Sequence, residues 1–124
     1  MINLVNSMSV KPVKMLEGVT MRLVIGPDQG APHFNLRIFE VQPEASTPFH
    51  SHWWEHEVFI LAGNGVVRNQ TEEKSIKPGD AILVPGGEIH QFINTGTEIL
   101  RFICLVPQEW LKSVSDQKKL ESDG

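Results

Sequence analysis

The stretch "GDAILVPGGEIHQFIN", residues 79–94, combines strand-forming residues with turn residues that precede a histidine. Its Ile, Leu, Val and Phe residues favour extended strands. Gly79 follows a proline, where a turn with a positive φ angle suits glycine. Pro85 and Gly87 would break the strand just before His90. The stretch therefore predicts two short strands and a histidine that is held on a fixed turn.

The rest of the chain continues this pattern of short apolar segments separated by turns. The segments expected as strands are residues 21–26, 34–41, 57–63, 65–69, 80–84, 89–94 and 99–106. The residues between them are rich in the Gly, Pro, Asn and Asp that turns require. Many short strands at fairly even spacing favour an all-β sandwich or barrel. After Pro107 the pattern changes, and we expect a short helix around 108–114 and a polar tail at about 115–124.

The last expected strand is apolar on both of its faces. One face carries Leu100, Phe102, Cys104 and Val106, and the other carries Ile99, Arg101, Ile103 and Leu105. One face would line a barrel interior. The other face must then be covered by a second sheet, by the terminal segments or by a partner subunit.

Length, charge and hydropathy restrict the class of protein. A chain of 124 residues is the size of one domain, so we expect residues 1–124 to form a single domain. A net charge of -4 without a basic cluster argues against nucleic acid as a partner. No apolar run reaches the roughly 20 residues that span a bilayer, and the first residues lack the features of a signal peptide. A cytoplasmic protein with no membrane partner is therefore expected, and the single Cys104 is consistent with a reducing compartment.

The stretch "HSHWWEHE", residues 50–57, holds three of the five histidines in the chain. His50 and His52 would project to the same face of an extended segment, where they could bind one ion together. His56 follows shortly after them, and His90 lies on another expected strand. Because a metal site needs three or four ligands that converge from different parts of the fold, the four histidines together indicate such a site.

These two stretches resemble the two motifs of the cupin family. Residues 50–63, "HSHWWEHEVFILAG", resemble the first motif, in which H-x-H is followed by an acidic ligand and a glycine. Residues 79–94 resemble the second motif, G-x5-P-x-G-x2-H-x3-N, at every defining position: Gly79, Pro85, Gly87, His90 and Asn94. With its flanking strands the resemblance covers roughly residues 20–107. It implies an all-β double-stranded β-helix, the cupin jelly-roll barrel, with a divalent metal inside its mouth.

The sequence departs from the usual cupin pattern at the acidic ligand. His56 stands at the three-residue spacing and Glu57 at the four-residue spacing after H-x-H. In a regular strand from residue 50 onward, position 56 shares the face of the first two histidines and position 57 points away. A bulge near Trp53 and Trp54 would instead bring Glu57 to the ion. The chain is similar to small bacterial cupins reading "HSHPWEHE", and that resemblance implies a four-histidine ligand set: His50, His52, His56 and His90.

The same resemblance bears on the metal and on the pocket. It favours manganese, although iron, nickel, zinc or copper would also suit imidazole ligands. Arg37, Phe102, Cys104 and Val106 are the candidates for pocket-lining residues. An arginine inside the barrel could bind a substrate carboxylate, although an exposed arginine on a strand is an equally good interpretation of Arg37. His33 is expected to be a surface or structural histidine.

We expect a homodimeric, metal-binding cupin that acts on a small organic molecule. The leading hypothesis is a dioxygenase-like oxidoreductase, because a metal with open positions can bind substrate and dioxygen together. One alternative is a redox-neutral lyase or isomerase that uses the metal as a Lewis acid. The other is a non-catalytic small-molecule-binding domain, since one fold serves many functions.

Overall fold

Nine strands in two antiparallel sheets make up the fold of the residues that the computed structural model describes, 1–110. The strands are β1 (Val13–Leu16), β2 (Val19–Ile25), β3 (Phe34–Val41), β4 (His56–Ala62), β5 (Gly65–Arg68), β6 (Glu73–Ile76), β7 (Ala81–Val84), β8 (Gln91–Asn94) and β9 (Leu100–Pro107). Single turns of 3-10 helix, η1 (Ser7–Ser9) and η2 (Pro27–Gln29), precede β1 and follow β2. The expected helix around 108–114 lies mostly outside the described residues, and the polar tail lies wholly outside them.

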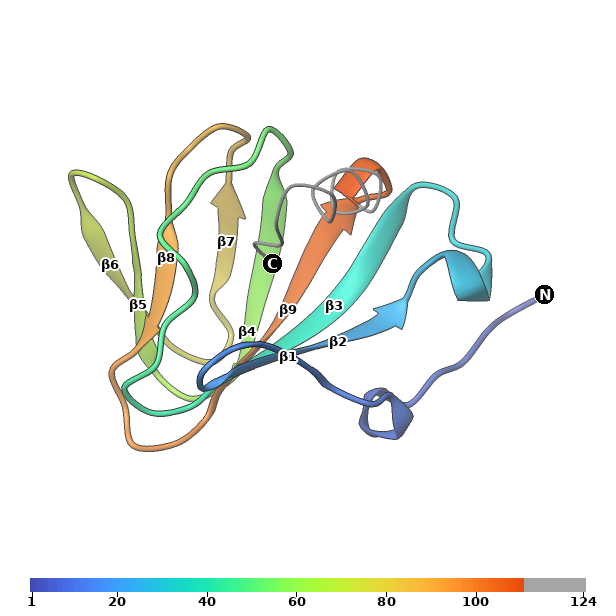
Figure 1. Cartoon of the computed structure of the whole chain (residues 1–124), viewed down its shortest axis with the longest axis horizontal. Coiled ribbons are helices and arrows are strands. Elements are labelled where there is room, and N and C mark those ends of the chain that lie inside the picture. Colours follow the sequence, from blue (N-terminus) through green and yellow to red (C-terminus); the bar gives the residue numbers. More distant parts are fainter. Residues whose placement is uncertain (111–124) are drawn as a thin grey trace.

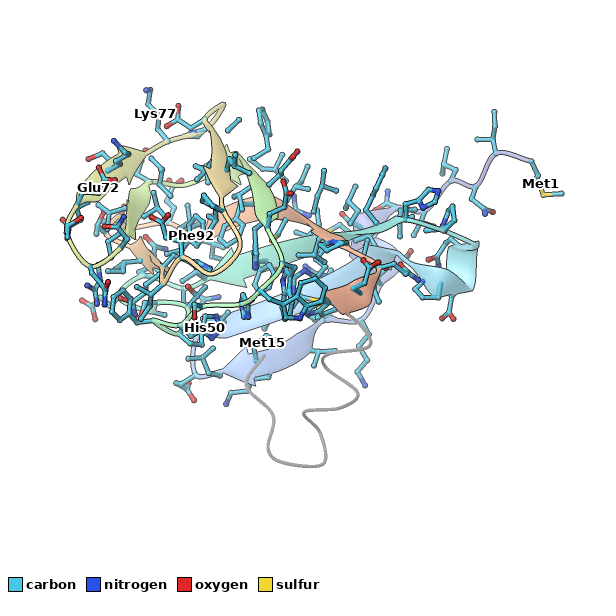
Figure 2. The ribbon with its side chains drawn as sticks, turned by 90° about the horizontal axis from the view of Figure 1, so that it is seen from above. Met1, Met15, His50, Glu72, Lys77 and Phe92 are labelled. Carbon is cyan, nitrogen blue, oxygen red and sulfur yellow. The ribbon has the colours of Figure 1, made fainter. Side chains whose placement is uncertain are left out.

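The larger sheet has the order β1-β2-β3-β9-β4-β7, and the smaller has the order β6-β5-β8 (Figure 1). The prediction of an all-β jelly-roll barrel is confirmed. No helix among residues 1–110 is long and apolar enough to cross a bilayer. Met1 lies at one end of the molecule and Glu72 and Lys77 at the other, with Met15, His50 and Phe92 between them (Figure 2).

The core lies between the sheets, and β9 is its central strand. β9 pairs with β3 over eight residues, from Phe34↔Pro107 to Val41↔Leu100, and with β4 on its other side. The predicted inner face of β9 is buried, with Leu100 0%, Phe102 2%, Cys104 2% and Val106 1% exposed. Because each fully buried large apolar side chain contributes about 1.5–3 kcal/mol, this strand is a principal source of stability.

Two features of the second histidine-bearing stretch hold its backbone. Gly79 and Gly87 have φ angles of 96° and 84°, so the turns that were expected there do require glycine. The Asn94 side chain is 2% exposed and donates to the carbonyls of Val41 and Glu98, both at 2.8 Å. Its Oδ1 accepts from the Gly96 amide at 2.9 Å. Asn94 therefore fixes the turn after β8 and also ties β8 to the larger sheet.

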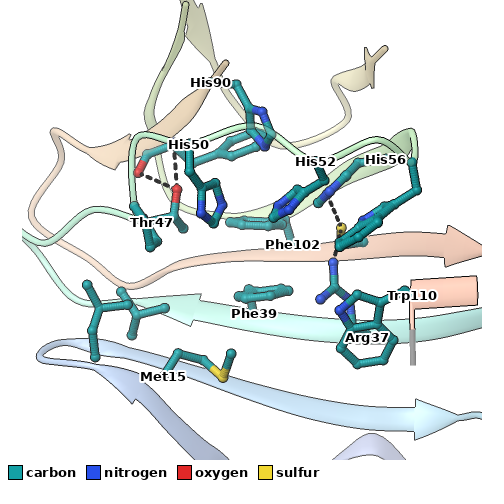
Figure 3. A pocket seen from close by; sticks show the side chains of 16 residues that line it. Met15, Arg37, Phe39, Thr47, His50, His52, His56, His90, Phe102 and Trp110 are labelled. Carbon is teal, nitrogen blue, oxygen red and sulfur yellow. Dashed lines mark hydrogen bonds between the residues drawn. The ribbon is translucent and has the colours of Figure 1, made fainter. Parts of the chain in front are cut away.

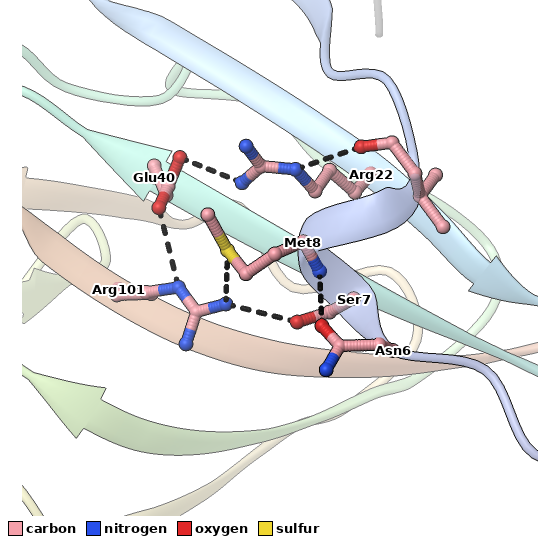
Figure 4. A network of polar contacts seen from close by, with 7 residues as sticks. Asn6, Ser7, Met8, Arg22, Glu40 and Arg101 are labelled. Atoms are coloured by element: carbon pink, nitrogen blue, oxygen red, sulfur yellow. Dashed lines mark hydrogen bonds and ion pairs between the residues drawn. The ribbon is translucent and has the colours of Figure 1, made fainter.

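The N-terminal segment covers part of the outer face of the larger sheet. Glu40 on β3 accepts from Arg22 at 2.9 Å and from Arg101 at 3.2 Å (Figure 4). The Arg101 guanidinium also donates to Ser7 Oγ at 3.1 Å, and Arg22 Nε donates to the Val10 carbonyl at 2.9 Å. These bonds hold η1 and the residues after it against β2, β3 and β9, so a terminal segment supplies part of the cover that the outer face needs.

Candidate metal centre

A cavity of about 330 Å³ opens between the two sheets. Four histidines line one side of it, as Figure 3 shows. Aromatic residues from several elements form much of the remaining wall: Phe39, Trp54, Phe92, Phe102 and Trp110. Its volume falls in the roughly 300–1,000 Å³ range of small-molecule sites. Among the described residues, no Asp or Glu lines the cavity.

Three histidines bring their ring nitrogens together. The ligand atoms of His50, His52 and His90 all lie within 4.8 Å of one another. Backbone hydrogen bonds hold two of these residues opposite each other, because the amide of His50 donates to the His90 carbonyl at 3.2 Å and the amide of His90 donates to the His50 carbonyl at 3.0 Å. The segment between β3 and β4 is thereby tied to the residue that precedes β8, so ligands from distant parts of the sequence meet at one place.

His56 lies beside this triad and is the first residue of β4. Its ring centroid is 5.0 Å from that of His52 and 5.2 Å from that of His90. The side chain is 7% exposed, and its Nε2 is buried without a hydrogen-bond partner among the described residues. A buried polar nitrogen without a partner is unfavourable. A metal ion bound by the neighbouring rings would provide a partner for the lone pair of this nitrogen.

The alternative ligand, Glu57, lies on the opposite face of β4. It is exposed, pairs with Leu83 and Leu105, and lines a shallow outer hollow together with Trp53. The assumption of a regular strand from residue 50 is wrong, since residues 51–55 are irregular and β4 begins only at His56. His56 faces the cavity because of where β4 starts.

Burial favours the neutral form of His52, His56 and His90 by lowering the pKa of each ring. It is the main cause that lowers the pKa of His56 to about 2 and that of His52 to about 3, and the Arg37 charge and the other histidines lower both further. Burial also lowers the pKa of His90. A neutral imidazole keeps a lone pair for a metal, whereas a protonated one does not, so these rings can bind an ion near neutral pH.

The residues fit a divalent transition-metal ion. Imidazole nitrogens suit Mn, Fe, Ni, Cu and Zn, and two ligands at roughly 2.1 Å from one ion are at most about 4.2 Å apart. The rings of His50, His52 and His90 would need to close around an ion, because ligand atoms at tetrahedral or octahedral angles are only about 3.0–3.4 Å apart. Such an adjustment is within the reach of side-chain rotation.

The pocket candidates from the sequence divide into two groups. Arg37 is 2% exposed, and it lines the cavity together with Phe102 and Cys104. Val106 is buried on the same face of β9 but lies outside the cavity lining, and it lines the outer hollow that His33 also lines.

Sequence reasoning did not identify Phe39, Phe92 or Trp110 as cavity residues, and it did not decide which of Trp53 and Trp54 faces the cavity. Phe39 and Phe92 stand two residues after Arg37 and His90, so period-two alternation could have identified them. Trp54 stacks on His52, with ring centroids 4.3 Å apart and an interplanar angle of 11°. It lies in the irregular segment before β4, and Trp110 follows β9, so no strand periodicity applies to either residue.

The profile of the Cupin domain matches residues 37–106, which is more than half of the chain. This chain belongs to the cupin family. The polyketide cyclase RemF from Streptomyces resistomycificus has a similar structure, with a TM-score of 0.80 and 34% sequence identity over 88% of this cupin and 81% of that chain.

Two curated proteins are also similar to this cupin. An oxalate-binding protein from Thermotoga maritima is 34% identical over 80 residues, which cover 61% of this chain and 66% of that protein. A 1-methylthio-D-xylulose 5-phosphate methylsulfurylase from Rhodospirillum rubrum is 35% identical over 74 residues, which cover 60% of this chain and 47% of that protein. This cupin thus spans between about half and two thirds of the length of these two relatives.

Proposed function

We propose that this cupin is a metal-dependent enzyme that closes rings in a small molecule with several carbonyl groups, by a redox-neutral condensation. The observation that carries this proposal is the pairing of a nitrogen-only ligand cluster with an aromatic cavity. His50, His52, His56 and His90 would hold the ion at one side of the cavity. When bound, the ion would supply a Lewis acid that polarises a carbonyl group.

The similarity to RemF supports ring closure as the reaction. That protein is a polyketide cyclase by name, and the 34% identity extends over most of both chains. Of the alternatives expected from the sequence, this similarity favours the redox-neutral one. The dioxygenase-like reaction stays a prediction, as do manganese as the ion, the homodimer and the cytoplasmic location.

The aromatic residues of the cavity would fold and orient the substrate. Phe39 and Phe102 stack with ring centroids 5.4 Å apart, and Phe92 and Phe102 stack at 5.0 Å. Flat aromatic faces favour stacked or edge-on contacts with other flat rings, so they suit a chain that becomes a planar ring. Holding the two reacting carbons in contact removes much of the entropic barrier to ring closure.

The chemistry of the lining residues agrees with a reaction that needs little acid or base strength. No carboxylate lines the cavity among the described residues, and the histidines are assigned to the metal. A proton between two carbonyl groups is acidic, so a polarised poly-β-ketone can lose it without a strong base. A water molecule takes that proton, the carbon attacks a second carbonyl group, and the oxygen of that group gains a proton from water. Loss of the new hydroxyl group together with a neighbouring proton, as water, completes the condensation, and no electrons leave the substrate.

A second candidate function is the binding of a small dicarboxylate without turnover. The relative from Thermotoga maritima that is named an oxalate-binding protein supports it. The electrostatics support it as well, because four neutral imidazoles leave the ion its full charge and Arg37 adds another positive charge nearby.

The two functions can be separated by one set of measurements. The cupin is loaded with Mn²⁺, Fe²⁺ or Zn²⁺ and incubated with a synthetic linear poly-β-ketone, in air and under anaerobic conditions, with His52→Ala as the inactive control. We expect cyclised product in both atmospheres. A requirement for oxygen would support the dioxygenase-like reaction, and oxalate binding without any product would support the binding function.

A further inference from the structure

Cys104 lies between the side chains of Arg37 and His56 in the buried wall of the cavity. Its Sγ is 3.0 Å from Nη2 of Arg37 and 3.2 Å from Nδ1 of His56. Cys104 and Arg37 are each 2% exposed, and His56 is 7% exposed. Both contacts are therefore largely shielded from bulk solvent.

The direction of the first hydrogen bond is fixed by chemistry. A guanidinium group only donates, so the sulfur accepts from Arg37. Arg37 is itself held in place, because its guanidinium carbon lies 4.9 Å from the ring centroid of Phe39 and 4.5 Å from that of Trp110. Within residues 1–110 it forms no ion pair with a carboxylate.

The direction of the second hydrogen bond decides which nitrogen of His56 is free. If Nδ1–H donates to the sulfur, Nε2 keeps its lone pair, and Nε2 is the atom that is buried without a partner. If the thiol donates instead, Nε2 carries the proton and cannot bind a metal. His90 provides a parallel, since its Nδ1 lies 2.9 Å from the Glu88 carbonyl, which can only accept. The His90 ring must therefore donate from Nδ1 in that bond and leave Nε2 free.

We propose that Cys104 is a positioning residue that selects the metal-binding tautomer of His56. Its sulfur, held by Arg37, accepts the hydrogen bond from Nδ1–H and presents Nε2 to the ion. Metal-bound histidines almost always donate their other ring N–H to an acceptor, and here the acceptor is a sulfur. This inference rests on the metal site of the proposed function.

The first test is the Zn²⁺ affinity of variants, measured by competition with a chromophoric chelator. Loss of such an acceptor typically weakens metal binding about 10- to 100-fold, and we expect this loss for Cys104→Ala. Cys104→Ser should recover part of the affinity, because a hydroxyl oxygen still accepts. Val106→Ala is the matched control, since Val106 is buried on the same face of β9 outside the cavity lining. It should lower the thermal stability and leave the affinity unchanged.

The second test is the tautomer itself, read from the ¹⁵N chemical shifts of the His56 ring. We expect the proton on Nδ1 in the metal-free and the Zn²⁺-loaded protein, and a mixture of tautomers in metal-free Cys104→Ala. A proton on Nε2 in the metal-free parent would overturn the inference, as would equal Zn²⁺ affinity in Cys104→Ala and Val106→Ala. If the parent bound no Zn²⁺, the proposed metal site would fail, while the tautomer measurement would still decide the role of Cys104.

Discussion

Acidification should destabilise the metal-free protein because His56 cannot take up a proton in the folded state. Its pKa is lowered to about 2 in the fold, whereas an unfolded chain has the ordinary value of 6.5. Below pH 6.5 the unfolded chain therefore binds a proton that the folded chain does not bind. The stabilising effect of the neutral ring is complete above pH 6.5 and is lost progressively as the pH falls toward 2.

The size of this effect follows from linkage. For one buried histidine with these two pKa values, the free energy of unfolding should fall by about 2 kcal/mol between pH 7 and pH 5. His52 and His90 shift in the same direction, so the measured loss should be at least this large. Against a total stability of about 5–15 kcal/mol, such a change is easily measured.

The assay is urea unfolding at pH 7, 6 and 5 at constant ionic strength, with a chelator present. In His56→Gln the difference in bound protons between the unfolded and the folded chain should fall by close to one. The free energy of unfolding should then decrease by about 1.4 kcal/mol less per pH unit toward the acidic end. His33→Gln changes an exposed histidine outside the cavity and should keep the full dependence. A parent protein with equal stability at pH 7 and pH 5, or an unchanged dependence in His56→Gln, would refute the reasoning.

Two further predictions concern the ligand set and the assembly. His56→Ala should lose most of its bound metal on dialysis. Glu57→Ala should retain its metal, because Glu57 lies on the exposed face of β4. Metal loss from Glu57→Ala alone would instead show that the Glu57 carboxylate binds the ion. The protein should be a dimer by light scattering at micromolar concentration, because its outer face exposes large apolar residues that a partner would cover. Phe59 is 44% exposed, Leu83 61% and Ile99 40%. Leu83→Glu should then shift the protein to a monomer, and a monomeric parent would contradict the prediction.

The strands could be predicted because they depend on local sequence, and the clustering of His50, His52 and His90 was expected from the resemblance to the two cupin motifs. The burial of alternate residues in β9 follows directly from period two, and the turns at Gly79 and Gly87 follow from their need for a positive φ. The strands β1 and β6 were not anticipated. Their sequences, VKML and EKSI, contain charged residues and lie at the edges of the sheets, where a strong apolar pattern is not required.

The surroundings of His56 depend on strand register, which a single sequence does not reveal. β4 and β9 pair so that Val58 lies opposite Cys104, and this register brings the sulfur to the ring of the preceding inward residue, His56. Arg37 reaches the same sulfur because β3 pairs with β9 at Arg37↔Cys104. Three residues that are far apart in the sequence thus meet through two registers, and changing either register would separate them.

The charge of the cavity connects its structure with the kind of reaction it can support. Arg37 brings a buried positive charge that is stabilised by aromatic faces and a sulfur, and a bound divalent ion would add two more without any carboxylate ligand. Inside a cavity, where the effective dielectric constant is below that of bulk water, such charges act strongly on any oxygen that becomes negative during a reaction. A condensation between carbonyl groups develops negative charge on oxygen at each step, whereas a cationic intermediate would be repelled. Among the described residues no Asp or Glu lines the cavity, so no carboxylate in the wall would weaken the field that the proposed condensation requires.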